Sequence, residues 1–254
     1  MPAPTALRAP AVHAFTSRNL PWLVDAQAAS RGERPYLIWE PFDATGRTWT
    51  YAQFAEETRA YAAGLAAMGV APGTFVLVHM DNCPEFLFLW HACARLGAIA
   101  VTTNTHSTAD ELAYFARHSG ATVAVTQPKF ASLLTGLPHA FRWIAVAATD
   151  SGQAPDSPPA ADLVPLARLR GNPQDAPARP PDPLAPNSVQ FTSGTTSRPK
   201  GVVWTQGNAL WAARTLASIL ELTAEDRGIV HFPLFHTNAP VSYTHLTLPT
   251  ICSV

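Results

Sequence analysis

The sequence predicts an α/β fold of mainly parallel β-sheets flanked by helices, and three observations support this fold class. Short β-rich apolar runs alternate along the chain with segments of helical periodicity. Two of those segments open with the spacing of a capping box, and three end at a glycine. The apolar runs are continuous, which is typical of strands buried on both faces. Strands that alternate with helices form βαβ units, which build a parallel sheet.

The first half of the chain shows this alternation most clearly. Thr50 and Gln53 have capping-box spacing and open a helix that Gly69 ends. Thr108 and Glu111 open another helix in the same way. From residue 75 onward the predicted elements are, in order, a strand at 75–80, a helix at 84–96, a strand at 98–102, a helix from 108 to near 120, and strands at 122–126 and 143–147.

The second half begins with a change in composition. Residues 150–187 are rich in Pro, Ala, Asp and Gly and predict a loop between subdomains, with a short strand within 161–166. The elements predicted after it, assigned to one sheet, are strands at 188–191, 201–204 and 228–232 and a helix at 205–222. The side chains expected in the core here are Trp204, Trp211, Phe232, Leu210, Leu216, Ile219 and Leu220.

The composition excludes several classes of protein. Lys and Arg number 17 against 18 Asp and Glu, so the net charge of −1 gives no basic footprint for nucleic acid. Three cysteines without CxxC spacing fit a reducing compartment rather than a disulfide framework. No signal peptide and no apolar run long enough to span a membrane is recognised, so a soluble cytoplasmic protein is expected.

The most informative stretch is the loop "FTSGTTSRPKG" at 191–201, which lies between two β-rich runs. Gly194 permits backbone angles that other residues avoid, and successive N–H groups in such a turn can bind an anion. Hydroxyl groups and the cation of Lys200 add donors that suit a polyphosphate. The hydroxyl residues are Thr192, Ser193, Thr195 and Thr196.

Two known phosphate loops do not match this pattern. A Walker A loop has its lysine after the second glycine and continues into a helix, whereas Lys200 precedes Gly201 and a strand follows. The dinucleotide-binding pattern G-x-G-x-x-G is also absent. A plain polar hairpin turn is the alternative reading, and the ordered pattern T-S-G-T-T-x-x-P-K-G-V favours the phosphate loop.

The segment "FTSGTTSRPKGV" resembles the phosphate-loop signature of the adenylate-forming acyl-CoA synthetases, the AMP-forming ligase superfamily. The stretch from "WTYAQF" to "TTNT" at 49–105 is similar to the N-terminal subdomain of that family, and "HFPLFHTNAP" at 231–240 resembles its segment beside the acyl pocket. The resemblance implies an incomplete N-terminal large domain of the adenylate-forming fold over 21–240, after a loosely ordered lead-in at 1–20.

The resemblance also implies the chemistry. A carboxylate attacks the α-phosphate of ATP to give an acyl-adenylate and pyrophosphate, and the thiolate of CoA then takes the acyl group. Metal-bridged phosphates and nearby cations stabilise the developing charge. ATP, Mg²⁺ and CoA are therefore expected, with a small carboxylic acid as substrate. The polyphosphate would be held by Thr192, Ser193, Gly194, Thr195, Thr196, Lys200 and Gly201.

Further roles follow from the same resemblance. The hydroxyl of Thr195 or Thr196 would help to hold Mg²⁺, and Lys200 is a phosphate contact rather than an assigned catalytic residue. His236, Thr237 and Asn238 would lie near the acid and the adenylate. For His236 an ordinary histidine at the end of a strand is the alternative.

The sequence departs from the family pattern in two places near the loop. Ser197 stands where many members have glycine, and Gln206 stands where many have histidine. "SRPK" at 197–200 is similar to carnitine/crotonobetaine-type CoA ligases, which indicates a small or medium acid.

The end of the chain does not match the family. The metal-binding Tyr-Gly-x-Thr-Glu, the ribose-binding Thr-Gly-Asp and the lysine of the mobile small domain are absent, and residues 241–254 resemble a truncation or assembly artefact. The chain is therefore expected to be the N-terminal part of a ligase that makes no acyl-CoA by itself. A nucleotide-binding module without turnover, a fatty-acyl-AMP ligase and a peptide-synthetase adenylation domain are the alternatives.

Overall fold

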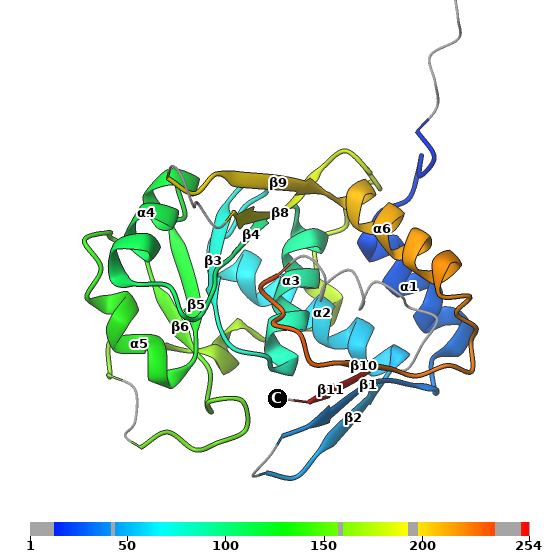
Figure 1. The fold of residues 1–254 in the computed structure, drawn as a ribbon, viewed down its shortest axis with the longest axis horizontal. Coiled ribbons are helices and arrows are strands. Elements are labelled where there is room, and N and C mark those ends of the chain that lie inside the picture. Colours follow the sequence, from blue (N-terminus) through cyan, green and yellow to red (C-terminus); the bar gives the residue numbers. More distant parts are fainter. Residues whose placement is uncertain (1–12, 42–43, 157–159, 193–197, 237–249, 254) are drawn as a thin grey trace, which may run out of the picture.

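The computed structural model describes residues 13–41, 44–156, 160–192, 198–236 and 250–253 (Figure 1). The elements of the first half are α1 (Leu20–Arg31), β1 (Pro35–Glu40), β2 (Arg47–Thr50), α2 (Tyr51–Ala67), β3 (Phe75–His79), α3 (Pro84–Leu96), β4 (Ile99–Thr102), α4 (Ala109–Ser119), β5 (Val123–Thr126) and α5 (Pro128–Thr135). Those of the second half are β6 (Ile144–Val146), β7 (Val164–Pro165), the 3₁₀ turns η1 (Leu166–Leu169) and η2 (Pro173–Asp175), β8 (Pro186–Phe191), β9 (Gly201–Thr205), α6 (Gln206–Ile219), β10 (Gly228–Val230) and β11 (Thr250–Ser253).

The described strands form two sheets. The larger sheet has seven strands in the order β7-β6-β5-β3-β4-β8-β9, and every neighbouring pair is parallel except β8 with β9. The smaller sheet has the order β10-β11-β1-β2, with β11 parallel to both neighbours and β1 antiparallel to β2. The predicted α/β class with mainly parallel pairing is confirmed.

One prediction about the sheets is wrong. The strand predicted at 228–232 was assigned to the same sheet as residues 188–204, whereas β10 belongs to the smaller sheet. α6 begins directly after the edge strand β9 and carries the chain away from the larger sheet (Figure 1). Local apolar pattern identifies a strand but not its neighbours, because pairing depends on long-range packing.

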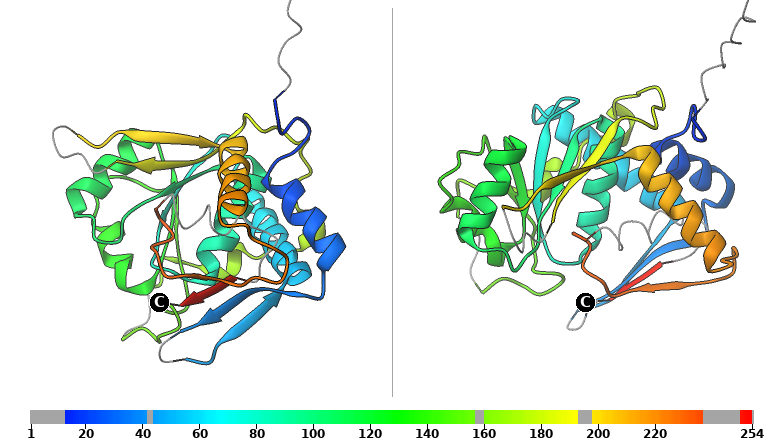
Figure 2. Two further views of the ribbon diagram at one scale, coloured as in Figure 1. Left: turned by 45° about the vertical axis from the view of Figure 1, so that its right-hand side comes forward. Right: turned by 45° about the horizontal axis from the view of Figure 1, so that its top comes forward.

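Two hydrophobic clusters cover the opposite faces of the larger sheet, because successive side chains of a strand point to opposite faces. Val76 and Val78 of β3 belong to the cluster with α1, α2 and α3, whereas Leu77 belongs to the cluster with α4 and α5. In Figure 1 and in the turned views of Figure 2 the sheet runs between α4 and α5 on one side and α2 and α3 on the other. The sheet is therefore buried on both faces, as the continuous apolar runs predict.

The helix starts follow the capping signals of the sequence. Thr50 and Thr108 cap α2 and α4, and in both cases the full capping box predicted from the sequence is present. A third box, formed by Thr205 and Asn208, opens α6. Each box satisfies backbone N–H groups that have no partner inside the helix.

The Pro-rich segment at 150–187 packs along α2 in its described part. The N–H of Gly171 donates to the carbonyl of Ala60 at 2.9 Å, and Arg170 forms two hydrogen bonds with Glu57 at 2.9 and 2.8 Å. Leu169 approaches α2 so closely that a Cβ on Gly64 would lie 1.9 Å from its carbonyl oxygen. Glycine is therefore required at this crossing.

Of the predicted lead-in at 1–20, residues 13–20 are described. Phe15 and Leu20 are buried here, and the side chain of Asn19 accepts a hydrogen bond from the N–H of Trp22 at 2.8 Å to cap α1. Residues 241–249 lie outside the described part, and Thr250–Ser253 form β11. The predicted boundary at 240 stays a prediction.

The expected core positions of the last helix are partly wrong. Leu210 is buried, but Ile219 and Leu220 are exposed, and so are Trp211 and Phe232, at 61% and 54%. α6 buries only the side that carries Gln206, Gly207, Ala209, Leu210 and Ala213. Its other side contacts no described element strongly enough to cover these side chains.

The cysteine and membrane predictions can be compared with the described part. Among the described residues, Cys83 and Cys93 are buried and form no disulfide, and burial raises the pKa of Cys93 to about 12. Among the described residues, no helix has the length and apolar character needed to cross a membrane.

Candidate functional site

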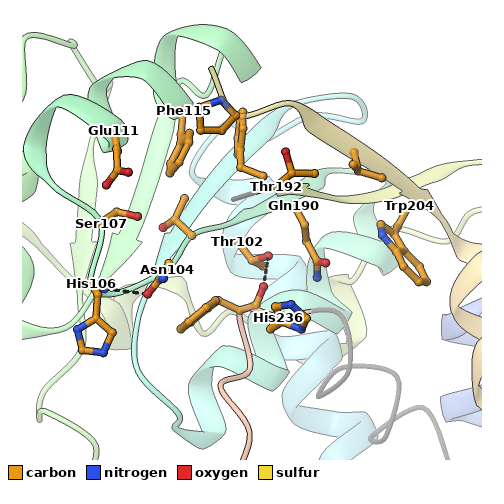
Figure 3. A pocket seen from close by; sticks show the side chains of 15 residues that line it. Thr102, Asn104, His106, Ser107, Glu111, Phe115, Gln190, Thr192, Trp204 and His236 are labelled. Carbon is orange, nitrogen blue, oxygen red and sulfur yellow. Dashed lines mark hydrogen bonds between the residues drawn. The ribbon is translucent and has the colours of Figure 1, made fainter. Parts of the chain in front are cut away.

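A cavity of about 740 Å³ opens at the carboxyl ends of β4 and β8 (Figure 3). Ligands of open parallel sheets bind at this edge, where the loops after the strands converge. The side chains that line it come from two separate stretches of the chain, 102–115 and 190–236: Thr102, Thr103, Asn104, His106, Ser107, Glu111, Phe115, Gln190, Phe191, Thr192, Pro199, Val202, Trp204, Phe235 and His236.

The predicted phosphate loop is closed at its base. The N–H of Thr192 donates to the carbonyl of Lys200 at 3.0 Å, and the N–H of Lys200 donates to Oγ1 of Thr192 at 3.1 Å. β8 and β9 continue this pairing as an antiparallel ladder that places Phe191 opposite Gly201. The two ends of the loop are therefore fixed at the rim of the cavity.

α4 holds both arms of the loop from one side. The hydroxyl of Tyr114 donates to the carbonyl of Pro199 at 2.9 Å, and the ring of Phe115 stacks on that of Phe191 at 4.2 Å. The guanidinium of Arg198 lies 5.6 Å from the centroid of the Tyr114 ring. These contacts tie the loop to a helix whose first turn also lines the cavity.

Gly201 leaves room for this stacked pair. A Cβ at Gly201 would lie 3.2 Å from Cγ1 of Val189 and 3.5 Å from Cε1 of Phe191. The first distance is tighter than ordinary van der Waals contact, so the side chain of Val189 would have to shift by a few tenths of an ångström to admit a side chain here.

The predicted site residues have different outcomes. Thr192 and His236 both line the cavity, although they are separated by 44 positions in the sequence (236 − 192). Lys200 is exposed, and its side chain is not among those that line the cavity. Gly201 is described at the start of β9 and does not line the cavity. The other predicted residues lie outside the described part, namely Ser193, Gly194, Thr195, Thr196, Thr237 and Asn238.

The prediction that Trp204 lies in the core is wrong. Its side chain lines the cavity beside Gln190 and His236 (Figure 3). Trp204 lies on β9 beyond the edge of the parallel part of the sheet, so one face of the strand is open to the cavity.

The segment that carries His236 is anchored by residues that sequence reasoning missed. Asn82 follows β3 and makes two hydrogen bonds to this segment, at 3.0 Å from Nδ2 to the carbonyl of Phe232 and at 2.7 Å from the N–H of Leu234 to Oδ1. Oγ1 of Thr102 donates to the carbonyl of Phe235 at 3.1 Å. Both anchors are polar residues at or after the carboxyl end of a parallel strand. This position in the sequence could have identified them as candidate site residues.

The opposite wall of the cavity is polar. Oε2 of Glu111 accepts from the N–H of Thr108 at 2.8 Å, so its carboxylate completes the capping box of α4 and also faces the cavity. Oδ1 of Asn104 accepts from the N–H of His106 at 2.9 Å (Figure 3). Glu111 is the only formal charge among the described lining residues.

A buried histidine lies below the rim. His79 is fully buried, its Nδ1 is 2.9 Å from Oγ1 of Thr103, and its Nε2 has no hydrogen-bond partner among the described residues. Burial lowers the pKa of His79 to about 4, against a smaller opposite effect of Asp81. His79 is therefore neutral near pH 7.

Comparison with known proteins identifies the family. A family model described as "AMP-binding enzyme" matches residues 24–249. The chain belongs to the AMP-binding enzyme family. The family resemblance predicted from the loop and the flanking segments is thereby confirmed.

Individual relatives agree with this assignment. The chain is 32% identical over 228 residues to the crotonobetaine/carnitine–CoA ligase of Salmonella paratyphi A, a match that covers 86% of this chain and 42% of the ligase. It is similar to the solved N-terminal domain of FACL13 from Mycobacterium tuberculosis, with a TM-score of 0.76, 27% identity, and coverage of 93% of this chain and 57% of that one. This chain thus spans less than half the length of the curated relative.

A third relative was solved with a bound intermediate. The o-succinylbenzoate CoA synthetase MenE from Bacillus subtilis, in complex with the acyl-adenylate intermediate OSB-AMP, has a TM-score of 0.68 and 25% identity. The match covers 91% of this chain and 55% of that one.

Proposed function

We propose that this chain is the N-terminal part of an ATP-dependent acyl-CoA ligase. The full enzyme would join a carboxylic acid to the α-phosphate of ATP, releasing pyrophosphate and forming an acyl-adenylate. The thiolate of CoA would then attack the acyl carbon and release AMP. The observation that carries the proposal is the closed loop base at the carboxyl edge of a parallel sheet in a member of the AMP-binding family.

The loop would hold the polyphosphate of ATP. Thr192 offers a hydroxyl at the rim of the cavity. Residues 193–197 lie outside the described part, and the sequence predicts that their backbone N–H groups would bind the anion. Lys200 is exposed, and its side chain does not line the cavity. Its long side chain would therefore contact a phosphate from the solvent side of the loop. The loop residues proposed for this role are Thr192, Ser193, Gly194, Thr195, Thr196, Lys200 and Gly201.

The acid would lie on the side of the cavity that His236 lines. Trp204 and Phe235 provide apolar surface there, and Gln190 provides a polar group, all facing the same space. Thr237 and Asn238 are proposed to continue this wall. The acids named for the Salmonella relative, crotonobetaine and carnitine, are candidates, because this chain is 32% identical to that ligase over 228 residues.

Mg²⁺ would accompany ATP. The described residues contain no group of three or more His, Cys, Asp or Glu side chains that could hold a metal, so they do not fit a cage made by the protein alone. Mg²⁺ is commonly held by substrate phosphates with one or two protein groups. Thr195 and Thr196 remain the proposed hydroxyl contacts, and the steps assigned to this chain involve binding and orientation only.

The proposal is tested by calorimetric titration of the purified chain with ATP and MgCl₂. We expect saturable binding that Thr192→Val weakens by about tenfold, because one hydrogen bond to a charged group is lost. Thr192→Ser keeps the hydroxyl and should restore binding, and Thr48→Val changes an exposed threonine on β2 as the control. A folded chain that shows no saturable ATP binding would overturn the proposal.

The same purified chain tests the prediction that it forms no acyl-CoA by itself. Incubated with ATP, CoA and a panel of aliphatic, aromatic and betaine acids, it should form no thioester detectable by mass spectrometry. Thioester formation would show that this chain completes the reaction without the additional length that its relatives possess.

A further inference from the structure

The side chain of Asn82 hydrogen-bonds to the backbone of the segment that carries His236, as a neighbouring strand would. Its amide donates from Nδ2 to the carbonyl of Phe232 and accepts at Oδ1 from the N–H of Leu234, at 3.0 and 2.7 Å. These two backbone groups flank Pro233, which has no N–H of its own. One side-chain amide therefore satisfies both the acceptor and the donor that a neighbouring strand would have satisfied.

The position of Asn82 makes this contact firm. Asn82 is 8% exposed and lies between β3 and the N-cap of α3, so its backbone is fixed by a central strand and a buried helix. Leu234, whose N–H donates to Asn82, is fully buried and packs in the cluster with α2 and α3. Residues 232–234 are therefore held both by the hydrogen bonds of Asn82 and by the packing of Leu234.

The next residues of the segment reach the cavity. Oγ1 of Thr102, at the end of β4, donates to the carbonyl of Phe235, and the N–H of His236 donates to the carbonyl of Pro233 at 3.0 Å. Among the described residues, the side chains that hydrogen-bond to this segment are those of Asn82 and Thr102. The wall formed by Phe235 and His236 therefore takes its position from the carboxyl ends of β3 and β4.

We propose that Asn82 is a positioning residue that fixes the acid-facing wall of the cavity by holding residues 232–236. Asn82 does not line the cavity, so it acts through the segment and not by contact with a ligand. The loop at 192–200 is held by α4 and not by Asn82. Loss of the clamp should consequently weaken binding of the acid and leave binding of ATP intact. The part concerning ligands rests on the proposed function.

The first experiment measures hydrogen exchange and needs no ligand. In Asn82→Leu, which has similar volume and no hydrogen-bonding groups, the amide of Leu234 should exchange at least about tenfold faster than in the wild type, because two hydrogen bonds are lost. Asn82→Asp keeps the acceptor for Leu234 and should give a smaller increase. Amides of β5 and α4 should exchange as in the wild type, which separates a local release from general loss of stability.

A matched control exists within the chain. Asn187 of β8 is fully buried, and neither of its amide atoms has a hydrogen-bond partner among the described residues. Asn187→Leu makes the same chemical change without removing such a clamp, so exchange at 232–236 should stay at the wild-type rate. Equal exchange at Leu234 in the wild type and Asn82→Leu would overturn the clamp.

The second experiment measures binding in the same variants. With ATP and MgCl₂ as the probe, Asn82→Leu should bind within about twofold of the wild type. With the panel of aliphatic, aromatic and betaine acids as probes, the acid that the wild type binds should bind at least about tenfold more weakly. If exchange at 232–236 rises while acid affinity is unchanged, the positioning role is wrong. If the wild type binds neither ATP nor any acid, the proposed function fails, and the exchange result still decides the clamp.

Discussion

Gln206 shows how one buried side chain can join three helices. Its Oε1 accepts from the N–H of Leu20 at 3.1 Å, and its Nε2 donates to the carbonyl of Ala94 at 3.0 Å. Leu20 opens α1 and Ala94 lies in the last turn of α3, so both backbone groups lack partners within their own helices. The glutamine, which stands where many family members have histidine, thus satisfies two helix ends from the first residue of α6.

We expect Gln206→Leu to lower the free energy of unfolding by about 2–3 kcal/mol, because it strands a buried donor and a buried acceptor. Urea denaturation followed by circular dichroism measures this change. Gln174→Leu, at an exposed position, is the control and should change stability by less than about 0.5 kcal/mol. A loss of similar size in the two variants would contradict this account of Gln206.

His91 makes the stability of the chain sensitive to acid. The ring is almost fully buried in α3, neither nitrogen has a hydrogen-bond partner among the described residues, and burial lowers its pKa to about 3, with Arg95 adding to the effect. An unfolded histidine has a pKa of about 6.5, so between that pH and about 3 the unfolded chain binds a proton that the folded chain does not. The contribution of the neutral His91 ring to the free energy of unfolding is therefore fully present above pH 6.5 and is lost progressively as the pH falls from 6.5 towards 3.

Replacement of this ring should flatten the pH dependence. In His91→Leu the slope of unfolding free energy against pH, measured between pH 4 and 6.5, should decrease by up to about 1.4 kcal/mol per pH unit. His231→Gln removes an exposed ring and serves as the control for loss of a surface histidine. An unchanged slope in His91→Leu would mean that the ring takes up its proton in the folded chain.

At the scale of elements, β9 depends on a glycine at its first position. Gly201→Ala places a Cβ against Val189 and Phe191, and we expect it to cost about 1 kcal/mol or more of stability and to weaken ATP binding. Gly228 opens β10, and a Cβ added there would have no other heavy atom within 4 Å, so Gly228→Ala is the matched control. Thermal unfolding and ATP titration of both variants make the comparison, and equal behaviour of the two would contradict it.

β9 is also the open edge of the larger sheet. Its outer side has no partner strand among the described elements, and Val203 is 54% exposed. Such edges pair with other chains, and a lysine on the edge opposes this. Val203→Lys should slow self-association in light scattering at unchanged free energy of unfolding. Thr122→Lys adds the same charge at an exposed position away from this edge and should have no such effect.

Local pattern predicted most of the elements between residues 50 and 232, because each carries its own signal. Capping residues marked α2 and α4, and Gly97 and Gly120 ended α3 and α4 in the left-handed conformation that favours glycine. α5 has eight residues and buries only Ala131 and Leu134, so its periodicity was too short to recognise. α1, β1 and β2 were also missed, although Asn19, Pro21 and Gly32 mark the two ends of α1.

The candidate site was only half predictable for a related reason. Thr192 and His236 were found from motifs, because each lies in a stretch with a recognisable order of residues. Trp204, Gln190 and Asn82 were not, because their roles depend on which strand ends meet at one edge of the sheet. The parallel order β3-β4-β8 is what brings residues 82, 102, 190 and 236 together, and no local pattern encodes it.

At the scale of the whole molecule, the chain is a partly covered α/β unit with its cavity at one edge. Large apolar side chains stay exposed on α6 and β10, among them Trp211, Ile219 and Ile229. The chain covers 57% of the solved N-terminal domain of FACL13 and 42% of the curated Salmonella ligase. We therefore propose for this chain the phosphate loop and one wall of the acid pocket, and no complete reaction.

We propose that the loop at 192–200 binds the polyphosphate of ATP. The most direct measurement is the ratio of ATP affinity to AMP affinity in the folded chain, by calorimetry in MgCl₂, for the wild type and for Lys200→Met. We predict that the wild type binds ATP at least about tenfold more tightly than AMP, and that Lys200→Met loses most of this difference while keeping its affinity for AMP. Equal affinities for ATP and AMP in the wild type, or a ratio that Lys200→Met leaves unchanged, would contradict the account.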